Sequence, residues 1–197
     1  MVRRTMLMAV NRFALRLVHH VTIEGPGLTL PDSGPAIIAA NHTSPLDPLF
    51  IQAQTWRHIR WVMAREYLEL PMSGWFWEAA EVIPVARDGK DSAAARAALR
   101  VLADGGVVGI FPEGRISPSR EMLPVETGIS LLAVKSGAPL YPVWIDGTQR
   151  GASMLSAVVQ PQETVLRFGT SIRAISGAGA VARIHKELVD AFDLLKT

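Results

Sequence analysis

The sequence of 197 residues contains no cysteine. A chain without thiols has no disulfide bonds, thiolate zinc sites, iron–sulfur clusters or cysteine nucleophile, and it tolerates any redox compartment. A charge excess is also missing, because 20 basic and 18 acidic residues give a formal net charge of +2. So small an excess, without aromatic residues interleaved among the basic ones, indicates that nucleic acid is not a partner.

Long apolar runs are missing as well, although 49% of the residues are hydrophobic and the mean hydropathy is +0.22. The longest stretch free of Asp, Glu, Lys and Arg covers residues 33–46 and includes His42 and two prolines. A membrane-spanning helix needs about 18 apolar residues, so none is predicted. A signal peptide is not predicted either, since Asn11, Arg12 and Arg16 interrupt the early apolar stretch. The length fits one domain with a sizeable core.

Residues 1–20 have the pattern of a helix that lies on a membrane surface. They contain four arginines and no acidic residue. Apolar residues recur there at helical spacing and form a wide face that includes Met6, Val10, Phe13 and Leu17. A basic, apolar helix that is too short to span is typical of interfacial binding, and the alternative is a helix packed on the core with its arginines in water. We expect an amphipathic membrane-associating helix here, followed by one domain over residues 21–197.

Tryptophan is concentrated in one stretch of the chain, at Trp56, Trp61, Trp75 and Trp77. Amphipathic rings favour a membrane interface or a binding surface, so this cluster agrees with a membrane role. The alternative for each of these rings is burial in the core.

From residue 35 onward the sequence alternates between short apolar runs and helical patterns. Apolar runs typical of buried strands occur at 36–40, 58–64, 82–86, 107–111, 140–145 and 164–172. Helical patterns occur at 44–55, where Ser44 is the expected N-cap, after Pro71, and at 92–103, 126–136 and 181–195. A strand–helix–strand order requires parallel strands. The predicted fold class is therefore α/β, a single domain with a mostly parallel β-sheet flanked by helices.

Polar residues follow three of the predicted strands directly, at 41–47, 87–90 and 112–115. Because the carboxyl ends of parallel strands form the ligand crevice of open α/β sheets, we expect these groups to meet at one edge. His42 precedes a predicted helix and Asp47 lies in its first turn, so the chain can fold back and pair them. The alternative makes Asp47 the capping-box partner of Ser44 and His42 a surface-loop histidine.

The spacing of this pair is not specific by itself, since His185 and Asp190 repeat it in a helix whose rotation points the two side chains apart. An imidazole oriented by a carboxylate accepts a proton from a hydroxyl at neutral pH. The sequence has no Gly-x-Ser-x-Gly elbow, so the expected nucleophile is the substrate's own hydroxyl. Arg87 and Arg115 are expected to bind an anionic group, most naturally a phosphate.

The sequence contains four ordered blocks, at 41–47 (NHTSPLD), 82–87 (VIPVAR), 111–114 (FPEG) and 141–143 (YPV). In this order they resemble the motifs of the PlsC-type family, the 1-acylglycerol-3-phosphate or lysophospholipid acyltransferases. The first block matches the family pattern NHxSxxD. A further stretch, 64–68 (AREYL), resembles a family segment whose basic residue approaches a phosphate.

The resemblance implies transfer of a fatty acyl group to the free hydroxyl of a lysophospholipid. The implied donor is acyl-CoA or acyl-carrier protein, and the leading acceptor is 1-acylglycerol-3-phosphate, which yields phosphatidic acid. No cofactor and no metal are expected beyond the acyl donor. The implied location is peripheral, on the cytoplasmic face of a membrane.

The resemblance also implies roles for individual residues. His42 is the expected general base and Asp47 its orienting partner. The implied substrate-binding residues are Arg65, Arg87, Glu113, Gly114 and Arg115.

The third block departs from the family pattern. Arg115 and Ile116 follow Gly114, where the family usually has Thr-Arg. This order resembles enzymes that reacylate lysophosphatidylethanolamine, so such an acceptor is the first alternative. A second alternative, from a different functional class, is a lipid-binding module without catalysis.

Overall fold

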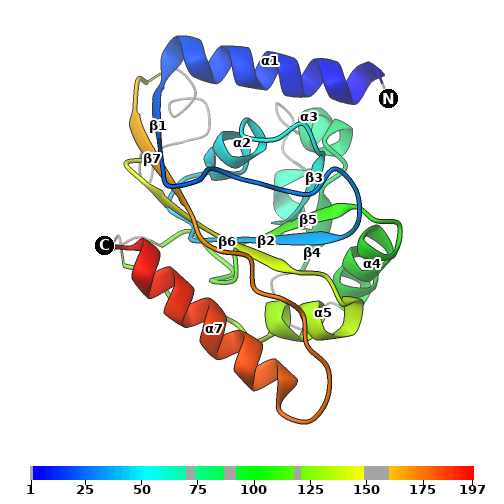
Figure 1. The fold of residues 1–197 in the computed structure, drawn as a ribbon. Coiled ribbons are helices and arrows are strands. Elements are labelled where there is room, and N and C mark those ends of the chain that lie inside the picture. The colour runs from blue at the N-terminus through cyan, green and yellow to red at the C-terminus, as the bar shows by residue number, and fades with distance from the viewer. Residues whose placement is uncertain (1, 70–73, 87–91, 118–120, 149–159) are drawn as a thin grey trace.

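The apolar runs of the sequence build a central sheet. The computed structural model describes residues 2–69, 74–86, 92–117, 121–148 and 160–197. Within these residues the strands form a seven-stranded sheet of order β1-β7-β6-β2-β5-β3-β4 (Figure 1). Its strands are β1 (His20–Glu24), β2 (Ala36–Ala40), β3 (Ile59–Ala64), β4 (Ile83–Val85), β5 (Val107–Ile110), β6 (Leu140–Asp146) and β7 (Glu163–Phe168).

Most of the sheet is parallel, as the sequence predicts. Strand β2 lies at its centre, parallel to β5 on one side and to β6 on the other. Strand β3 is parallel to β5, and β4 is parallel to β3. Strand β7 reverses this direction against β6, and β1 joins β7 in parallel at the edge. The carboxyl ends of the strands from β6 to β4 therefore lie at one edge of the sheet.

Helices cover both faces of the sheet. Figure 1 shows one helical layer above it and one below. The upper layer contains α1 (Val2–Val18), α2 (Asp47–Gln52) and α3 (Gly74–Ala79), and the lower layer contains α4 (Ser92–Ala103), α5 (Gly128–Ser136) and α7 (Ala180–Leu195). All five residues of β2 are buried, with Ile38 in the core under the upper helices and Ile37 in the core under the lower ones. This two-sided burial is the reason that β2 is a continuous apolar run.

Helix α1 packs on α2 through one face only. Its Leu15 is buried, while the Asn11 Nδ2 donates to the Leu49 carbonyl at 2.9 Å. The Arg12 Nε donates to the Ala53 carbonyl at 2.6 Å. The opposite face carries an exposed apolar stripe, defined by Met6, Val10, Phe13 and Leu17. No helix in the described part of the chain has the length and hydropathy to cross a bilayer.

Three expectations from the sequence need correction. The helix expected over 44–55 is shorter, with Leu46 as N-cap in place of Ser44, because the carboxylate of Asp47 binds the chain of the preceding turn. The strand expected over 164–172 ends at Phe168, and Ile172 adds only an isolated bridge to Leu140. Helix α5 begins two residues later than expected, at Gly128.

The tryptophan cluster is not one surface. Trp61 and Trp77 are 4% and 1% exposed and belong to the core above the sheet, so burial in the core is confirmed for both. Trp56 is 56% exposed, and the guanidinium of Arg12 lies 4.8 Å from the centre of its ring. Trp61 and Trp77 therefore serve the core and Trp56 does not, while the side chain of Trp75 lies outside the described part of the chain.

Candidate active site

Sequence-predicted site residues gather at the carboxyl edge of the sheet. His42 follows β2, Glu113 follows β5, and Arg65 begins a 3-10 helix directly after β3 (Arg65–Tyr67). Arg87, expected after β4, lies outside the described residues. The parallel strand directions bring these segments together from positions far apart in the sequence.

His42 and Asp47 are paired, as predicted. The Nδ1 of His42 lies 3.0 Å from Oδ2 of Asp47, so an Nδ1–H donates to the carboxylate. The same oxygen accepts the backbone N–H of Thr43 at 2.7 Å and that of Ser44 at 2.8 Å. The Asp47 side chain is fully buried, whereas the His42 ring is 16% exposed. This arrangement turns Nε2 of the ring away from the carboxylate.

The second His-x4-Asp pair does not form. In α7, Asp190 accepts a hydrogen bond from Lys186 Nζ at 2.5 Å. His185 lies on the same helix, where five residues rotate the side chains apart, as the sequence predicts. The His-x4-Asp spacing therefore brings the two side chains together at His42, in a turn before a short helix, and not at His185, within a long helix.

Aromatic rings from two neighbouring strands stack behind His42. The ring of Phe111, just after β5, lies parallel to the imidazole at 4.0 Å between centroids, with 14° between the planes. Trp61 of β3 stacks on the other side of Phe111 at 4.7 Å and 12°. Phe111 belongs to the third sequence block, but the sequence indicates no role for it. Its contact with His42 arises only because β5 lies beside β2 in the sheet.

Glu113 is buried and binds backbone groups. Its Oε1 accepts the N–H of His42 and its Oε2 the N–H of Leu123, each at 2.7 Å. Burial raises the pKa of the Glu113 carboxyl above its usual 4.5, and the two N–H donors together with His42 oppose this rise. Both carboxylate oxygens are thus engaged in holding the chain around His42.

Asn41 and Thr43 tie the same turn to β6 and to the residues just after it. The Asn41 amide donates to the Ile145 carbonyl at 2.8 Å and accepts the Ile145 N–H at 2.7 Å, which continues the sheet ladder with a side chain. The hydroxyls of Thr43 and Thr148 are hydrogen-bonded to each other. No local sequence pattern indicates Thr148, since its partner is 105 positions away.

The remaining expected residues lie at the rim of the site. Arg65, Gly114 and Arg115 are exposed. Gly114 adopts φ +69, which favours glycine, and its surroundings are open. Among the described residues, no group of three or more His, Cys, Asp or Glu side chains is arranged to hold a metal ion.

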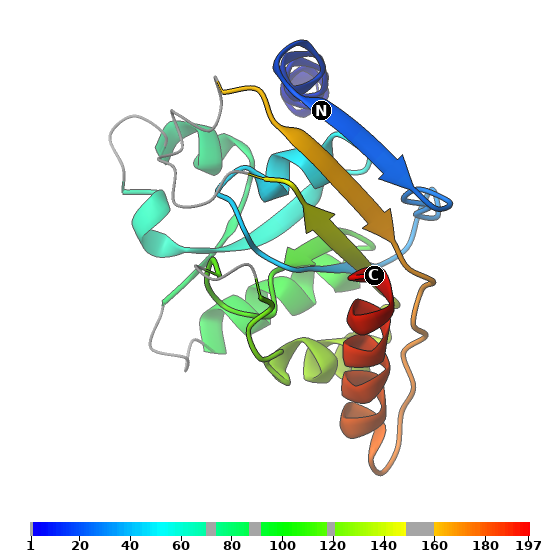
Figure 2. The same cartoon turned by 90° about the vertical axis from the view of Figure 1, so that its left-hand side faces the viewer.

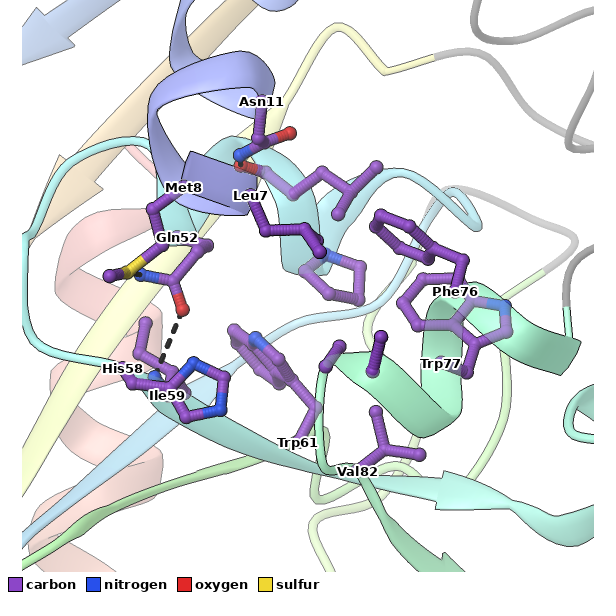
Figure 3. A pocket seen from close by; sticks show the side chains of 14 residues that line it. Leu7, Met8, Asn11, Gln52, His58, Ile59, Trp61, Phe76, Trp77 and Val82 are labelled. Carbon is purple, nitrogen blue, oxygen red and sulfur yellow. Dashed lines mark hydrogen bonds between the residues drawn. The ribbon is translucent and has the colours of Figure 1, made fainter. Parts of the chain in front are cut away.

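An apolar cavity of about 40 Å³ adjoins the site beneath α1. Figure 3 shows Leu7 and Met8 of α1 on one side of it and Trp61, Phe76 and Trp77 on the other. Gln52 borders the cavity and accepts the Ile59 N–H at 2.9 Å. Trp61 connects the cavity with the His42 site, because it lines the cavity and also stacks on Phe111.

Comparison with known families agrees with this geometry. The model of the family described as Acyltransferase matches residues 20–146, which include the His42–Asp47 turn, β5 and Glu113. The chain belongs to the acyltransferase family. The resemblance to the PlsC-type acyltransferases inferred from the four blocks is confirmed.

Several acyltransferases of known name are similar to the chain. It is 30% identical over 138 residues to the 1-acyl-sn-glycerol-3-phosphate acyltransferase of Pseudomonas aeruginosa, covering 67% of this chain and 53% of that one. It is 30% identical over 116 residues to the enzyme of the same name from Limnanthes alba, covering 57% and 41%. The chain spans about half the length of such relatives or less. The crystal structure of the 1-acyl-sn-glycerophosphate acyltransferase PlsC from Thermotoga maritima matches with a TM-score of 0.75 at 22% identity, over 97% of this chain and 79% of that one. This match establishes the common fold.

Proposed function

We propose that this protein transfers a fatty acyl group from acyl-CoA or acyl-carrier protein to the free hydroxyl of a lysophospholipid. The acceptor proposed first is 1-acylglycerol-3-phosphate, and the product is phosphatidic acid. The observation that carries the proposal is the His42 imidazole held by the buried Asp47 carboxylate at the rim of the sheet. The names of the similar acyltransferases support the same reaction.

In the proposed reaction, Nε2 of His42 takes the proton of the acceptor hydroxyl. The hydroxyl oxygen forms a bond to the thioester carbonyl carbon, and the resulting tetrahedral intermediate expels the thiolate. The thiolate takes the proton back from His42, which restores the base. The chain has no cysteine, so no acyl-cysteine forms, and the absence of a Gly-x-Ser-x-Gly elbow favours direct transfer. Positioned general-base help contributes about 10²- to 10⁴-fold in rate.

The turn around His42 has no spare backbone donors for the developing oxyanion. The N–H of His42 is bound to Glu113, and those of Thr43 and Ser44 are bound to Asp47. These three donors hold the base and its partner in place. Any backbone donor to the oxyanion must therefore come from outside residues 42–44.

The phosphate of the acceptor is proposed to bind the arginines of the site. Arg65 and Arg115 are exposed near strand ends at the edge that carries His42. Arginine matches the geometry of phosphate oxygens with two parallel N–H donors. Arg87 joins this set from its position in the second sequence block.

We also propose that α1 holds the protein at a membrane surface, where a lysophospholipid resides. Figure 2 shows α1 end-on as an outer layer, on the side of the molecule opposite α7. Its exposed apolar stripe faces away from α2, and Arg12 and the exposed Trp56 lie beside each other at its border. Apolar, basic and tryptophan side chains together suit the headgroup region of an anionic leaflet. The cytoplasmic leaflet is the proposed side, as the family resemblance implies.

The order of Gly114, Arg115 and Ile116 supports one second candidate, the acylation of lysophosphatidylethanolamine. A zwitterionic headgroup carries less net negative charge than a phosphate monoester, so fewer arginine contacts are required. Incubation with a panel of lysophospholipids and both donors, followed by mass spectrometry of the products, separates the two acceptors.

The decisive variant is His42→Ala, with His185→Ala as the matched control, since both histidines belong to a His-x4-Asp sequence. Acyl transfer is expected to fall by about 10²-fold or more in His42→Ala and to be retained in His185→Ala. Near wild-type turnover in His42→Ala would overturn the mechanism. Liposome binding without turnover for any donor and acceptor would identify the chain as a lipid-binding module.

A further inference from the structure

The hydrogen bond to Asp47 does not fully determine the orientation of the His42 ring, so a second neighbour must fix it. A single hydrogen bond from Nδ1 to Oδ2 sets where one ring nitrogen lies. It does not by itself set the plane of the ring, because one hydrogen-bond distance constrains only one combination of the two side-chain torsions, χ1 and χ2. The direction of the Nε2 lone pair depends on that plane, and proton transfer requires an aligned lone pair.

Phe111 supplies the missing constraint. Its ring lies nearly parallel to the imidazole, 4.0 Å away between centroids and tilted by only 14°. A rotation of the imidazole out of this plane would drive its edge into the Phe111 face, since carbon atoms already touch at about 3.5–4.0 Å in such contacts. The hydrogen bond and the stack together leave the ring with one orientation.

Phe111 is itself held from behind. Trp61 stacks on its far face at 4.7 Å and 12°, and Trp61 is buried. Trp61 in turn lies over Gly109, its register partner in β5. A Cβ at Gly109 would stand 2.5 Å from the nearest Trp61 ring atom, so glycine leaves the space that the indole occupies. Three rings thus form a supported stack: two from the segments that follow β2 and β5, and one from β3.

We propose that Phe111 is a positioning residue that fixes the plane of the His42 imidazole for proton transfer. The proposal rests on the acyl transfer proposed above. Phe111 acts through His42 and takes no part in the chemistry. Its effect therefore falls on kcat and leaves the KM for acceptor and donor nearly unchanged.

The test compares Phe111→Leu with Phe111→Tyr in the full chain. Leucine keeps an apolar side chain but offers no flat face, whereas tyrosine keeps the ring. Phe111→Leu is expected to lower kcat by about 10- to 100-fold, the range caused by small misplacements of reacting groups, with each KM within about twofold of wild type. Phe111→Tyr is expected to restore kcat to within about threefold of wild type.

A second perturbation reaches the stack from its far end. Gly109→Ala places a methyl group against Trp61 and is expected to lower kcat in the same direction, with KM again unchanged. Thermal unfolding of each variant identifies any that fails to fold, and the spectroscopic measurement below needs no turnover.

Nuclear magnetic resonance of the histidine ring protons reports the stack directly. The Phe111 ring current shifts the His42 carbon-bound protons upfield in the wild type, and His42→Ala assigns these signals. In Phe111→Leu they are expected to move downfield, and in Phe111→Tyr to stay close to their wild-type positions. A wild-type kcat in Phe111→Leu would overturn the proposal, while the loss of activity in His42→Ala would leave the proposed function standing. A wild-type protein without acyl transfer on any acceptor would overturn both.

Discussion

Replacing Asp47 by Asn removes one charge from the site and keeps the shape of the side chain. The Asn Oδ1 is able to occupy the place of the carboxylate Oδ2 and to accept the N–H groups of Thr43 and Ser44, which now lie 2.7 and 2.8 Å from it. The ring of His42 retains an acceptor at its Nδ1. What disappears is the negative charge facing the imidazolium that forms when His42 takes the proton.

The size of this effect follows from the 3.0 Å separation between Nδ1 and Oδ2. Two unit charges at that distance attract by about 5 kcal/mol at an effective dielectric constant of about 20. Each 1.36 kcal/mol of transition-state stabilisation corresponds to about tenfold in rate. Asp47→Asn is therefore expected to lower kcat by about 10³- to 10⁴-fold, with little loss of stability.

Asp47→Ala is the matched comparison, because it removes the charge and the acceptor together. It leaves the N–H groups of Thr43 and Ser44 without a partner, and both residues are buried. Each orphaned donor costs about 1–3 kcal/mol, so the free energy of unfolding is expected to fall by about 2–6 kcal/mol. Asp47→Ala thus loses activity and stability, whereas Asp47→Asn loses activity alone.

Release of the donor thiol, followed with a thiol reagent, measures both variants, and the absence of cysteine keeps the protein from contributing to the signal. Chemical denaturation gives the free energies of unfolding. If Asp47→Asn retained more than a tenth of the wild-type kcat, the electrostatic role assigned to Asp47 would be wrong.

Three further predictions concern other parts of the molecule. The raised pKa of Glu113 means that the folded state binds the proton of this carboxyl more tightly than the unfolded state does. The free energy of unfolding of the wild type is therefore expected to fall relative to that of Glu113→Gln as the pH rises from about 4.5 through the folded-state pKa, and to change no further above it. Chemical denaturation across this pH range measures both proteins, and a constant difference between them would contradict the raised pKa. Asn41→Ala removes both side-chain hydrogen bonds to the buried Ile145, and it is expected to lower the free energy of unfolding by about 2–6 kcal/mol. Urea denaturation measures this loss, and a loss under about 1 kcal/mol would show that the two hydrogen bonds contribute little to stability. Replacing the exposed Val10 and Phe13 of the apolar stripe by Ser is expected to weaken binding to anionic vesicles by at least about tenfold, without lowering Tm. A vesicle sedimentation assay measures the binding, and unchanged binding would show that this stripe does not contact lipid.

Local sequence patterns predict much of the fold. Strand β2 and helix α4 have the predicted boundaries, because a five-residue apolar run is typical of a buried strand and an alanine-rich amphipathic segment of a helix. Strand β1 was not predicted, since it lies at the sheet edge with mostly exposed side chains and has no continuous apolar run. The start of α2 was misplaced because the Asp47 carboxylate organises the preceding turn.

The pairing of His42 with Asp47 is the part of the site that the sequence determines by itself. The two residues are five positions apart, and a turn that leads into a short helix is enough to bring them together. The family membership rests on the same local blocks, together with their order along the chain.

Only the tertiary structure decides how that pair is held. Glu113 reaches the His42 N–H across 71 positions, and Asn41 reaches Ile145 across 104. Phe111 and Trp61 meet the imidazole only because β5 and β3 lie in that order beside β2. A contact between distant residues depends on which strands become neighbours, and strand order is set by the packing of the whole core. Local sequence therefore specifies the reactive pair, while the assembled sheet specifies the orientation in which His42 faces its substrate.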